Sequence, residues 1–268
     1  MKDALIVSIL SITPKRLASS LLGRFAHAIL SKPVMRAYVW LYGVNLSEAV
    51  RSELHEYTSL SDLFTRALKP SCRPIDPTEN GLVSPVDGTV AYCGPSNNGR
   101  APFLDGRPID LSNLLSRPVS TDDDVVVLYL SPKDYHRIHS PIDGEIKRVV
   151  HIPGLRFPVF PSAVRAVAGL FENNERVVID LETHNGPLTL TMVAAFGVGH
   201  MLWPDGTTIW RNPQAPQPNQ TSGEWLGTFD LGSTVILTVP RGTLNWQITS
   251  GEAVQMGQLI ATRTSHDG

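Results

Sequence analysis

The chain has 268 residues, of which 42% are hydrophobic and 18% are charged. This composition excludes a disordered chain and is typical of a folded protein with a substantial core, organised as one large domain or as a domain with an appendage. The 23 Lys and Arg residues nearly balance the 25 Asp and Glu residues. The resulting net charge of −2 excludes a nucleic-acid-binding protein that works through its overall charge.

Residues 1–50 are predicted to form amphipathic helices with a basic start. The first 40 residues carry six basic side chains and a single acidic one, Asp3. Apolar residues recur at helical spacing, Pro33 is expected to interrupt the pattern, and aromatic residues follow in 34–44. Such a segment either lies on an anionic membrane surface or packs its apolar stripe on the rest of the protein. Its uncharged stretches are shorter than the about 20 apolar residues of a membrane span.

Two further short helices are predicted before the pattern changes. Residues 45–50 offer Ser47 as an N-cap, and residues 59–68 offer Ser59 or Ser61. A serine hydroxyl at this position accepts a hydrogen bond from a backbone N–H of the first helical turn, which favours a helix start.

From residue 69 onward the sequence pattern is typical of a β protein. The proline-rich stretch 69–81 ends the helical part. Cys72 and Cys93 fit no metal-binding spacing and are predicted to be reduced thiols. Apolar and β-branched runs predict five strands: 124–130, 144–150, 175–180, 187–195 and 233–239.

An internal echo suggests a duplication. The sequence "SPVDGTV" (84–90) recurs as "SPIDGEI" (140–146), and a glycine-punctuated stretch (250–261) resembles lipoyl- and biotinyl-type barrel-sandwich domains. Asp87 and Asp143 within the echo are explained as turn residues that lead into strands. We therefore expect an α+β fold, with N-terminal amphipathic helices and a β-rich core that resembles a duplicated barrel-sandwich hybrid.

The segment "SPKDYHRIHSP" (131–141) carries two histidines, His136 and His139, three residues apart. They are open to three interpretations. As metal ligands they need a third partner, which the fold would have to recruit from His184 or His200. They also fit structural histidines in a turn, or a general base and a proton donor, because imidazole titrates near neutral pH.

A second chemical candidate is "GST" (232–234), which precedes the last long predicted strand. The simplest interpretation is a turn. A reactive Ser233 would need a base and a group that orients the base. The chain contains residues of these types, namely the histidine pair and the two Asp-Gly turns, and residue spacing does not decide whether they meet.

The order of the motifs resembles phosphatidylserine decarboxylases of the bacterial type. The similarity runs from about residue 38 to the C-terminus, and the basic helical N-terminus is similar in kind. The motifs that carry it are "FTRALKPSCRPID" (64–76), "SPVDGTV" (84–90), "SPKDYHRIHSP" (131–141), "GLFENNERVV" (169–178) and "LGSTVIL" (231–237).

The resemblance implies a self-processing triad. The serine of the Gly-Ser-Thr motif, the self-processing nucleophile, corresponds to Ser233. The aspartate of the first Ser-Pro-x-Asp-Gly copy corresponds to Asp87, and Asp143 has no such role. The second histidine of the Tyr-His-Arg-x-His motif, His139, completes the triad, and the first, His136, is the expected proton donor in decarboxylation.

The resemblance also implies that the enzyme makes its own cofactor. Ser233 would attack the carbonyl of Gly232, and the resulting ester would break by β-elimination into a chain of residues 1–232 and a chain of residues 233–268. Residue 233 would become a pyruvoyl group, whose carbonyl is the electron sink for converting phosphatidylserine into phosphatidylethanolamine and CO₂. No metal or diffusible cofactor is expected.

The implied organisation is a membrane-associating region (1–58) followed by a catalytic domain (59–268). We expect a peripheral protein at the cytoplasmic face of the cell membrane, with a phospholipid substrate, the two processed chains associated, a homodimer, and no nucleic-acid partner.

Two positions depart from the family pattern, and two other functions remain as alternatives. Phe160 stands where the family usually has Asn, and His200 stands where it usually has Ser. Both residues are candidates for the substrate pocket, with a surface position as the simpler account of His200. The alternatives are a non-catalytic barrel-sandwich carrier or binding module, and a zinc hydrolase that uses His136 and His139.

Overall fold

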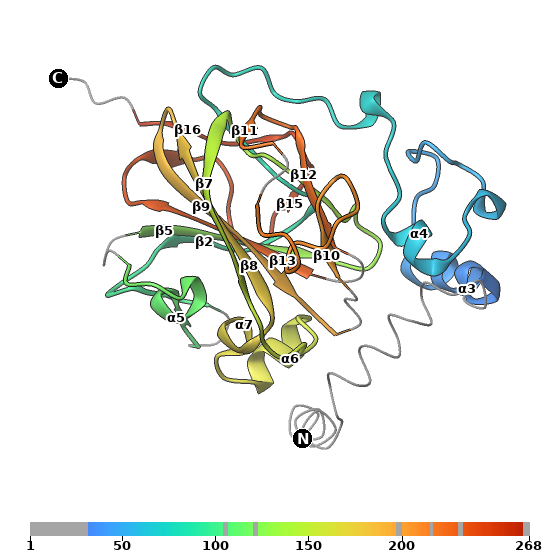
Figure 1. The fold of residues 1–268 in the computed structure, drawn as a ribbon, viewed down its shortest axis with the longest axis horizontal. Coiled ribbons are helices and arrows are strands. Elements are labelled where there is room, and N and C mark those ends of the chain that lie inside the picture. Colours follow the sequence, from blue (N-terminus) through green and yellow to red (C-terminus); the bar gives the residue numbers. More distant parts are fainter. Residues whose placement is uncertain are drawn as a thin grey trace.

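The computed structural model describes residues 32–103, 107–119, 123–196, 200–214, 217–229 and 233–264. The basic start of the chain, up to residue 31, and Gly232 of the predicted cleavage site lie outside the described residues. Strands dominate the described part, and short helices lie at its borders, so the fold is β-rich and of the α+β class (Figure 1).

The helices are short. They are α3 (Lys32–Tyr42), α4 (Leu60–Phe64), α5 (Leu111–Leu115), α6 (Pro161–Ala166) and α7 (Leu170–Asn173), with 3₁₀ turns at Leu54–Glu56 and Pro70–Cys72. The strands are β1 (Leu82–Val83), β2 (Gly88–Pro95), β3 (Arg100–Ala101), β4 (Ile109–Asp110), β5 (Asp123–Leu130), β6 (Arg137–His139), β7 (Gly144–Ile152), β8 (Arg176–Thr183), β9 (Gly186–Ala194), β10 (Met201–Leu202), β11 (Asn219–Gln220), β12 (Trp225–Phe229), β13 (Ser233–Pro240), β14 (Leu244–Trp246), β15 (Ala253–Val254) and β16 (Leu259–Arg263). All five predicted strands are present, as β5, β7, β8, β9 and β13.

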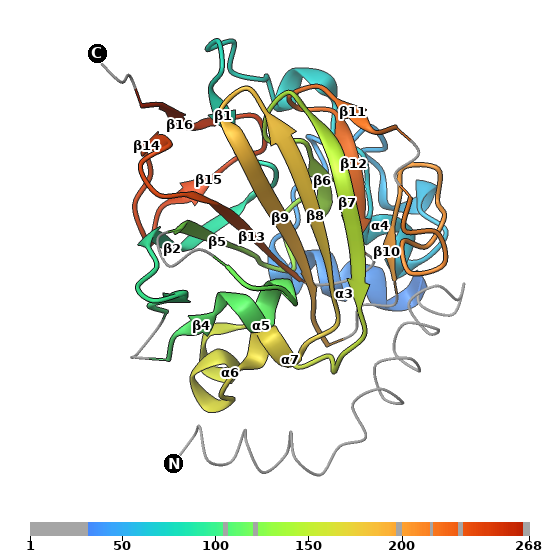
Figure 2. The same cartoon turned by 60° about the vertical axis from the view of Figure 1, so that its left-hand side comes forward.

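An antiparallel sheet of eight strands organises the molecule, in the order β11-β7-β8-β9-β13-β5-β2-β15. In Figure 2, β7, β8 and β9 run side by side while β13, β5 and β2 turn away from them. Strand β13 lies between β9 and β5 and is buried on both faces, as its apolar and β-branched residues favour. Smaller sheets, β1-β16-β14 and β10-β12-β6, complete the β part.

The helices at the two borders have different packing. In both views α5, α6 and α7 gather at one end of the sheet. Helices α3 and α4 contact each other and enclose a small separate core of Met35, Tyr57 and Leu63. The hydroxyl of Tyr38 in α3 donates to the carbonyl of Pro132 (2.6 Å), which ties this border to the loop that follows β5.

The two copies of the internal echo form the same local turn. Ser84 donates its hydroxyl to the carbonyl of Val86 (2.7 Å), and Ser140 donates to the carbonyl of Ile142 (2.8 Å). In both copies the serine backbone pairs with a distant glycine turn, through Gly257 for the first and Gly223 for the second. The echo is therefore a repeat of structure as well as of sequence.

The predicted helix at residues 45–50 is wrong. This segment is a tight turn, closed by the Ala49 N–H on the Leu46 carbonyl (3.0 Å), that pairs with the residues after α4: the Val50 N–H donates to the Ala67 carbonyl (2.9 Å), and the Lys69 N–H donates to the Glu48 carbonyl (2.8 Å). The backbone hydrogen bonds that a helix would make locally are made here across the chain, so pairing outweighs the local N-cap signal.

Two details concern the helices near the N-terminus. Pro33 lies in the first turn of α3, where a residue needs no N–H partner, and the residues before Lys32 lie outside the described part. Helix α4 ends at Phe64 and is shorter than predicted, while Ser59 is its N-cap and accepts from the Asp62 N–H (3.2 Å). Cys72 and Cys93 are free thiols, as predicted. Within the described ranges, no helix combines the length and apolar character needed to cross a bilayer.

Candidate active site

Ser233 begins the central strand β13 in a fully buried position. It pairs with Leu130 of β5 on one side and Ala194 of β9 on the other, and its exposed fraction is 0%. Its Oγ atom has no hydrogen-bond partner within the described part of the chain. Because a buried hydroxyl normally has a partner, this orphan group marks Ser233 as a site with a purpose other than stability.

The end of β5 brings Ser233 close to the segment that carries Asp87. Thr89 lies opposite Tyr129, so Gly88 lies beside Leu130, and a Cβ at Gly88 would approach the Tyr129 carbonyl oxygen to 2.6 Å. Only glycine fits there. Ser233 and Gly88 are thus two strands apart, about 10 Å between Cα atoms at the usual strand spacing.

Both histidines are also tied to this region by backbone hydrogen bonds. The His139 N–H donates to the carbonyl of Pro85 (2.9 Å), two residues before Asp87, and the Phe229 N–H donates to the carbonyl of His136 (3.1 Å). Only residues 230–232 separate Phe229 from Ser233. The backbone around the four predicted site residues is therefore connected: Asp87 precedes β2, Ser233 begins β13, and the two histidines lie at β6.

Asp87 is held by an arginine that the sequence prediction did not assign. The Arg73 Nε atom donates to both carboxylate oxygens (2.9 and 3.1 Å), and Nη2 donates to Oδ2 (2.6 Å). The Met256 N–H donates to Oδ1 (2.9 Å), and Arg73 also pairs with Glu48 (2.9 Å). Asp87 and Arg73 are both buried, so the carboxylate lies directly against a matched cation away from water.

Asp143, the equivalent residue in the second copy, lacks this partner. Its carboxylate accepts the Ser222 N–H (2.6 Å), as Asp87 accepts the Met256 N–H, but the residue is exposed and forms no ion pair among the described residues. The turn role is common to both copies, and the buried charge belongs to Asp87 alone.

The hydrogen bonds of His139 fix its tautomer. Nδ1 faces the Gly223 carbonyl (2.8 Å), which can only accept, so Nδ1 carries the proton. The Tyr135 hydroxyl donates to Nε2 (3.0 Å), which is therefore the basic nitrogen. Burial lowers the pKa of His139, and the Gly223 hydrogen bond and the nearby Asp87 charge oppose this shift. His139 is thus a neutral imidazole with its lone pair on Nε2.

The structure does not bring Asp87 and His139 into a direct hydrogen bond. The Asp87 carboxylate is occupied by Arg73 and Met256, and both ring nitrogens of His139 have other partners. Asp87 acts on His139 through its charge.

His136 has the same tautomer as His139, and its surroundings are more apolar. Nδ1 donates to the Asp134 carbonyl (2.9 Å), and the ring lies 3.9 Å from the Phe64 ring, centroid to centroid. Burial lowers the pKa of His136 to about 3. The side chain is neutral, and its Nε2 lone pair meets no hydrogen-bond donor from the residues that the structure describes. His136 and Ser233 are thus two orphan groups in the same region.

Three residues at the site were missed by sequence reasoning. Arg73 and Tyr135 lie inside motifs that carried the family resemblance, so their motifs were a usable signal. Gly223 acts through its backbone carbonyl, which every residue possesses, so its residue type offered no signal.

The two other candidate histidines and Phe160, the second departure from the family pattern, have exposed side chains. His184 and His200 are exposed. Phe160 is 40% exposed at the N-terminal end of α6. In the part of the chain that the structure describes, no three His, Cys, Asp or Glu side chains are grouped to hold a metal ion.

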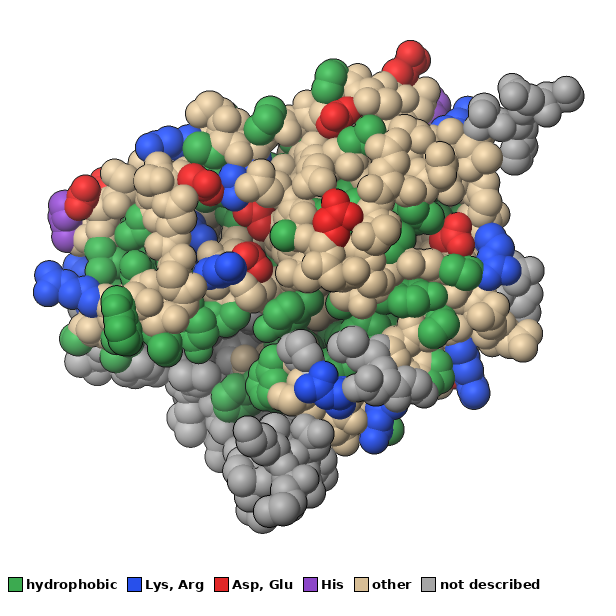
Figure 3. Space-filling view, turned by 180° about the vertical axis from the view of Figure 1, so that it is seen from behind, with side chains coloured by type: hydrophobic (Ala, Val, Ile, Leu, Met, Phe, Trp, Pro, Cys, Tyr) green, Lys and Arg blue, Asp and Glu red, His purple; other side chains and the backbone are tan. Residues whose placement is uncertain are grey.

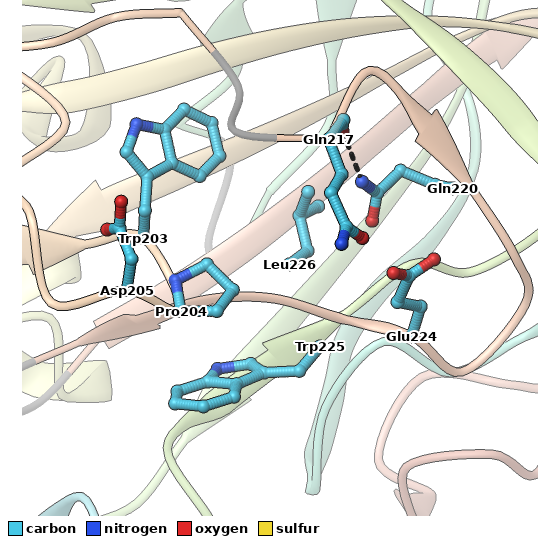
Figure 4. Close-up of a pocket in the computed structure, with 8 residues that line it drawn as sticks. All are labelled: Trp203, Pro204, Asp205, Gln217, Gln220, Glu224, Trp225 and Leu226. Carbon is cyan, nitrogen blue, oxygen red and sulfur yellow. Dashed lines mark hydrogen bonds between the residues drawn. The ribbon is translucent and has the colours of Figure 1, made fainter.

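A cavity of about 340 Å³ lies beside the strand that neighbours His139. Trp203 and Pro204 form one side, and Leu226 lies between them and the polar side chains opposite (Figure 4). Its complete lining is Trp203, Pro204, Asp205, Gln217, Gln220, Glu224, Trp225 and Leu226.

A second cavity of about 320 Å³ is mainly apolar and is lined in part by Tyr129, Phe171 and Thr234. Neighbouring side chains of a strand point to opposite faces of a sheet. The Ser233 side chain therefore points away from the cavity that Thr234 lines.

Comparisons with known proteins agree on one family. A family model described as phosphatidylserine decarboxylase matches residues 60–262. Curated relatives named "Phosphatidylserine decarboxylase proenzyme" include that of Acidovorax ebreus (strain TPSY), which is 36% identical over 98% of this chain and 99% of the relative. Those of Marinobacter nauticus (35%; 96% and 97%) and Polaromonas naphthalenivorans (36%; 97% and 97%) are similar along nearly their whole lengths.

Proposed function

The chain belongs to the phosphatidylserine decarboxylase family, and from that premise we propose how its own residues carry out the reaction. Its activity is the decarboxylation of phosphatidylserine to phosphatidylethanolamine, and the chain is made as a self-processing proenzyme. The carrier-module and zinc-hydrolase alternatives are therefore set aside.

We propose that the chain cleaves itself between Gly232 and Ser233. Two observations carry this proposal: the Oγ of Ser233 is buried and has no hydrogen-bond partner among the described residues, and His139 is a neutral histidine with a basic Nε2. His139 Nε2 accepts the Ser233 proton, and Oγ attacks the carbonyl carbon of Gly232. The peptide bond becomes an ester with a free amine at residue 233.

The ester then breaks without an added reagent. Loss of the Cα proton of residue 233 expels the Gly232 carboxylate, which ends the chain 1–232. Hydrolysis of the remaining dehydroalanine releases ammonia and leaves a pyruvoyl group at the start of the chain 233–268. Two associated chains are the product.

Asp87 supports this step through its charge. Arg73 and the Met256 N–H hold the carboxylate in place, and its negative charge stabilises the imidazolium that forms when His139 accepts the proton. Tyr135 must release Nε2 before His139 can act, so its hydrogen bond restrains the base.

Residue 233 suits a pyruvoyl group. It begins a strand, is excluded from water, and lies in the region of His136, so a group formed there would be held in a buried place near a proton carrier. When present, the group supplies an electron sink for the departure of CO₂.

His136 must gain a proton before it can donate one. Its Nδ1–H is committed to the Asp134 carbonyl, and its Nε2 is an unprotonated acceptor. The ammonium group of the substrate is a proton source of the right kind. We propose that the anionic groups of the bound substrate raise the pKa of His136, so that Nε2 accepts this proton, which leaves the substrate amine neutral, and later delivers it to the carbon from which CO₂ has departed.

We also propose a peripheral position on the cytoplasmic face of the membrane, with the region 1–58 in contact with lipid. Helix α3 supports this, because it buries Met35 and exposes Trp40 (84%) and Leu41 (66%). Hydrophobic side chains also gather along the lower part of the face in Figure 3. We further propose that the chain is divided into domains at 1–58 and 59–268 and that it forms a homodimer. Its core would be a duplicated barrel-sandwich built on the two echo turns.

The decisive experiment is a gel and mass analysis of the purified protein. We expect two fragments that separate between residues 232 and 233, the smaller with a blocked, carbonyl-reactive N-terminus. Ser233→Ala and His139→Ala should remain intact, whereas His136→Ala should cleave and lose decarboxylation. An intact wild-type chain with an unmodified serine would contradict the proposal.

A further inference from the structure

Arg66 is a buried cation that lacks an anion. It is 4% exposed, and its Nη2 atom donates to the carbonyls of Lys133 (2.7 Å) and Asp134 (3.4 Å). Among the residues that the structure describes, its Nε–H has no hydrogen-bond partner. Within the described residues no carboxylate lies at ion-pair distance from Arg66, although a buried guanidinium normally has such a partner.

The nearest carboxylates are committed to other groups. The negative charges of Asp87 and Asp134 both interact electrostatically with Arg66. The Asp87 carboxylate is bound by Arg73, and the Asp134 carboxylate accepts from the backbone N–H and hydroxyl of Ser131 (2.7 and 2.8 Å). Leaving a cation uncompensated in a buried place is costly, which is expected where the compensating charge arrives with a ligand.

The position of Arg66 connects it to the reaction. The Arg66 Nη2 and the His136 Nδ1 both donate to the carbonyl oxygen of Asp134, so the two side chains meet at one atom. The Tyr38 hydroxyl of α3 binds the Pro132 carbonyl, the residue before Lys133. Arg66 thus lies between the catalytic histidine and the helix that exposes Trp40 to the outside.

We propose that Arg66 binds the phosphodiester of the lipid headgroup and so places the serine part of the substrate at His136. This inference rests on the proposed function. The substrate carries two anions, a phosphate and a carboxylate, and a planar guanidinium with free N–H donors suits a phosphate.

The carboxylate is the less suitable partner. Its charge leaves it as CO₂ departs, so an ion pair with Arg66 would stabilise the bound substrate more than the transition state and would slow the reaction. The phosphodiester keeps its charge throughout. The Phe64 ring against His136 adds an apolar wall, which fits a carboxylate that must lose its charge.

The test compares two short-chain lipids on the processed enzyme. Dihexanoylphosphatidylethanolamine has the phosphate without the carboxylate, and its Kd is measured by calorimetry. Dihexanoylphosphatidylserine provides KM and kcat. Arg66→Ala should weaken binding of the first about 10- to 100-fold and raise KM for the second by a similar factor, with a smaller change in kcat. Arg66→Lys, which keeps the charge, should recover part of the affinity.

Arg51→Ala is the matched control. Arg51 is another arginine of the N-terminal border, and it is already paired with Asp62, so its removal should leave both measurements unchanged. Each variant is first checked on a gel for the two fragments. Failure of the wild-type chain to cleave would refute the proposed function, whereas cleaved Arg66→Ala with unchanged affinity would refute only the role of Arg66.

Two further outcomes would overturn the assignment. A loss confined to phosphatidylserine, with phosphatidylethanolamine binding intact, would show that Arg66 binds the carboxylate. Loss of self-cleavage in both Arg66→Ala and Arg66→Lys would show that the residue serves processing.

Discussion

Replacing Asp87 by Asn separates the two roles of this carboxylate, as a turn residue and as a buried charge. Asn keeps the volume and can still accept the Met256 N–H, but it cannot balance Arg73. Asp143→Asn makes the same change in the exposed copy of the turn, where no arginine is present. The pair of variants therefore isolates the effect of charge.

The size of the effect follows from the contacts. Breaking a buried ion pair costs about 3–5 kcal/mol when the remaining charge is left alone. Arg73 keeps Glu48 as a partner (2.9 Å), so we expect a smaller loss, about 2–3 kcal/mol. At about 2–4 °C per kcal/mol, this lowers Tm by roughly 4–12 °C. Asp143→Asn should stay within about 0.5 kcal/mol of the parent.

Self-cleavage should respond to the same change. Without the Asp87 charge the imidazolium of His139 is less stable, so cleavage should slow by about 10-fold or more, which corresponds to about 1.4 kcal/mol. Cleavage is followed on gels after cell-free synthesis, and stability is measured in the uncleaved Ser233→Ala background. Cleavage at the parental rate in Asp87→Asn, or equal harm from Asp143→Asn, would refute the reasoning.

Three other variants test the two histidine environments and the proposed membrane contact. Between pH 6.5 and about 3 the unfolded chain binds a proton that native His136 does not, so the free energy of unfolding of the Ser233→Ala precursor should fall as pH falls. His136→Gln should make that slope shallower by up to about 1.4 kcal/mol per pH unit in denaturant titrations. Tyr135→Phe removes a hydrogen bond that must break before His139 acts, so cleavage on gels should quicken by about 5-fold, and slower cleavage would contradict the assignment. Trp40→Ala should weaken sedimentation with anionic vesicles by about 10-fold and leave Tm unchanged, whereas unchanged sedimentation would exclude Trp40 as a membrane contact.

The parts of the fold that the sequence predicts best are the long buried strands. The run 233–239 is rich in apolar and β-branched residues, which suits a strand that is covered on both faces and paired on both edges. Short strands such as β6 and β12 have no such pattern and exist because they pair with each other. The N-cap signal at 45–50 predicts a helix that does not form for the same reason, since the structure of this segment depends on distant backbone partners.

For the site, too, the sequence predicts some of the functional groups and not others. Motifs supplied the reactive groups Ser233, His136 and His139, whose residue types are needed for the chemistry. They did not supply the groups that set the tautomers, which are the backbone carbonyls of Gly223 and Asp134. A carbonyl is present at every position, so its role becomes visible only when the fold places it against an imidazole.

The shared tautomer explains how two nearby histidines divide the work. Each donates Nδ1–H to a backbone carbonyl and therefore presents a basic Nε2. His139 lies within reach of the Asp87 charge, which favours the imidazolium needed to activate a serine, and Tyr135 covers its lone pair. His136 lies against Phe64 with an uncovered Nε2, and burial makes it a weak base that gives up a proton readily. A proton held there is available to a carbanion in every turnover, whereas His139 needs to act once in the life of the chain.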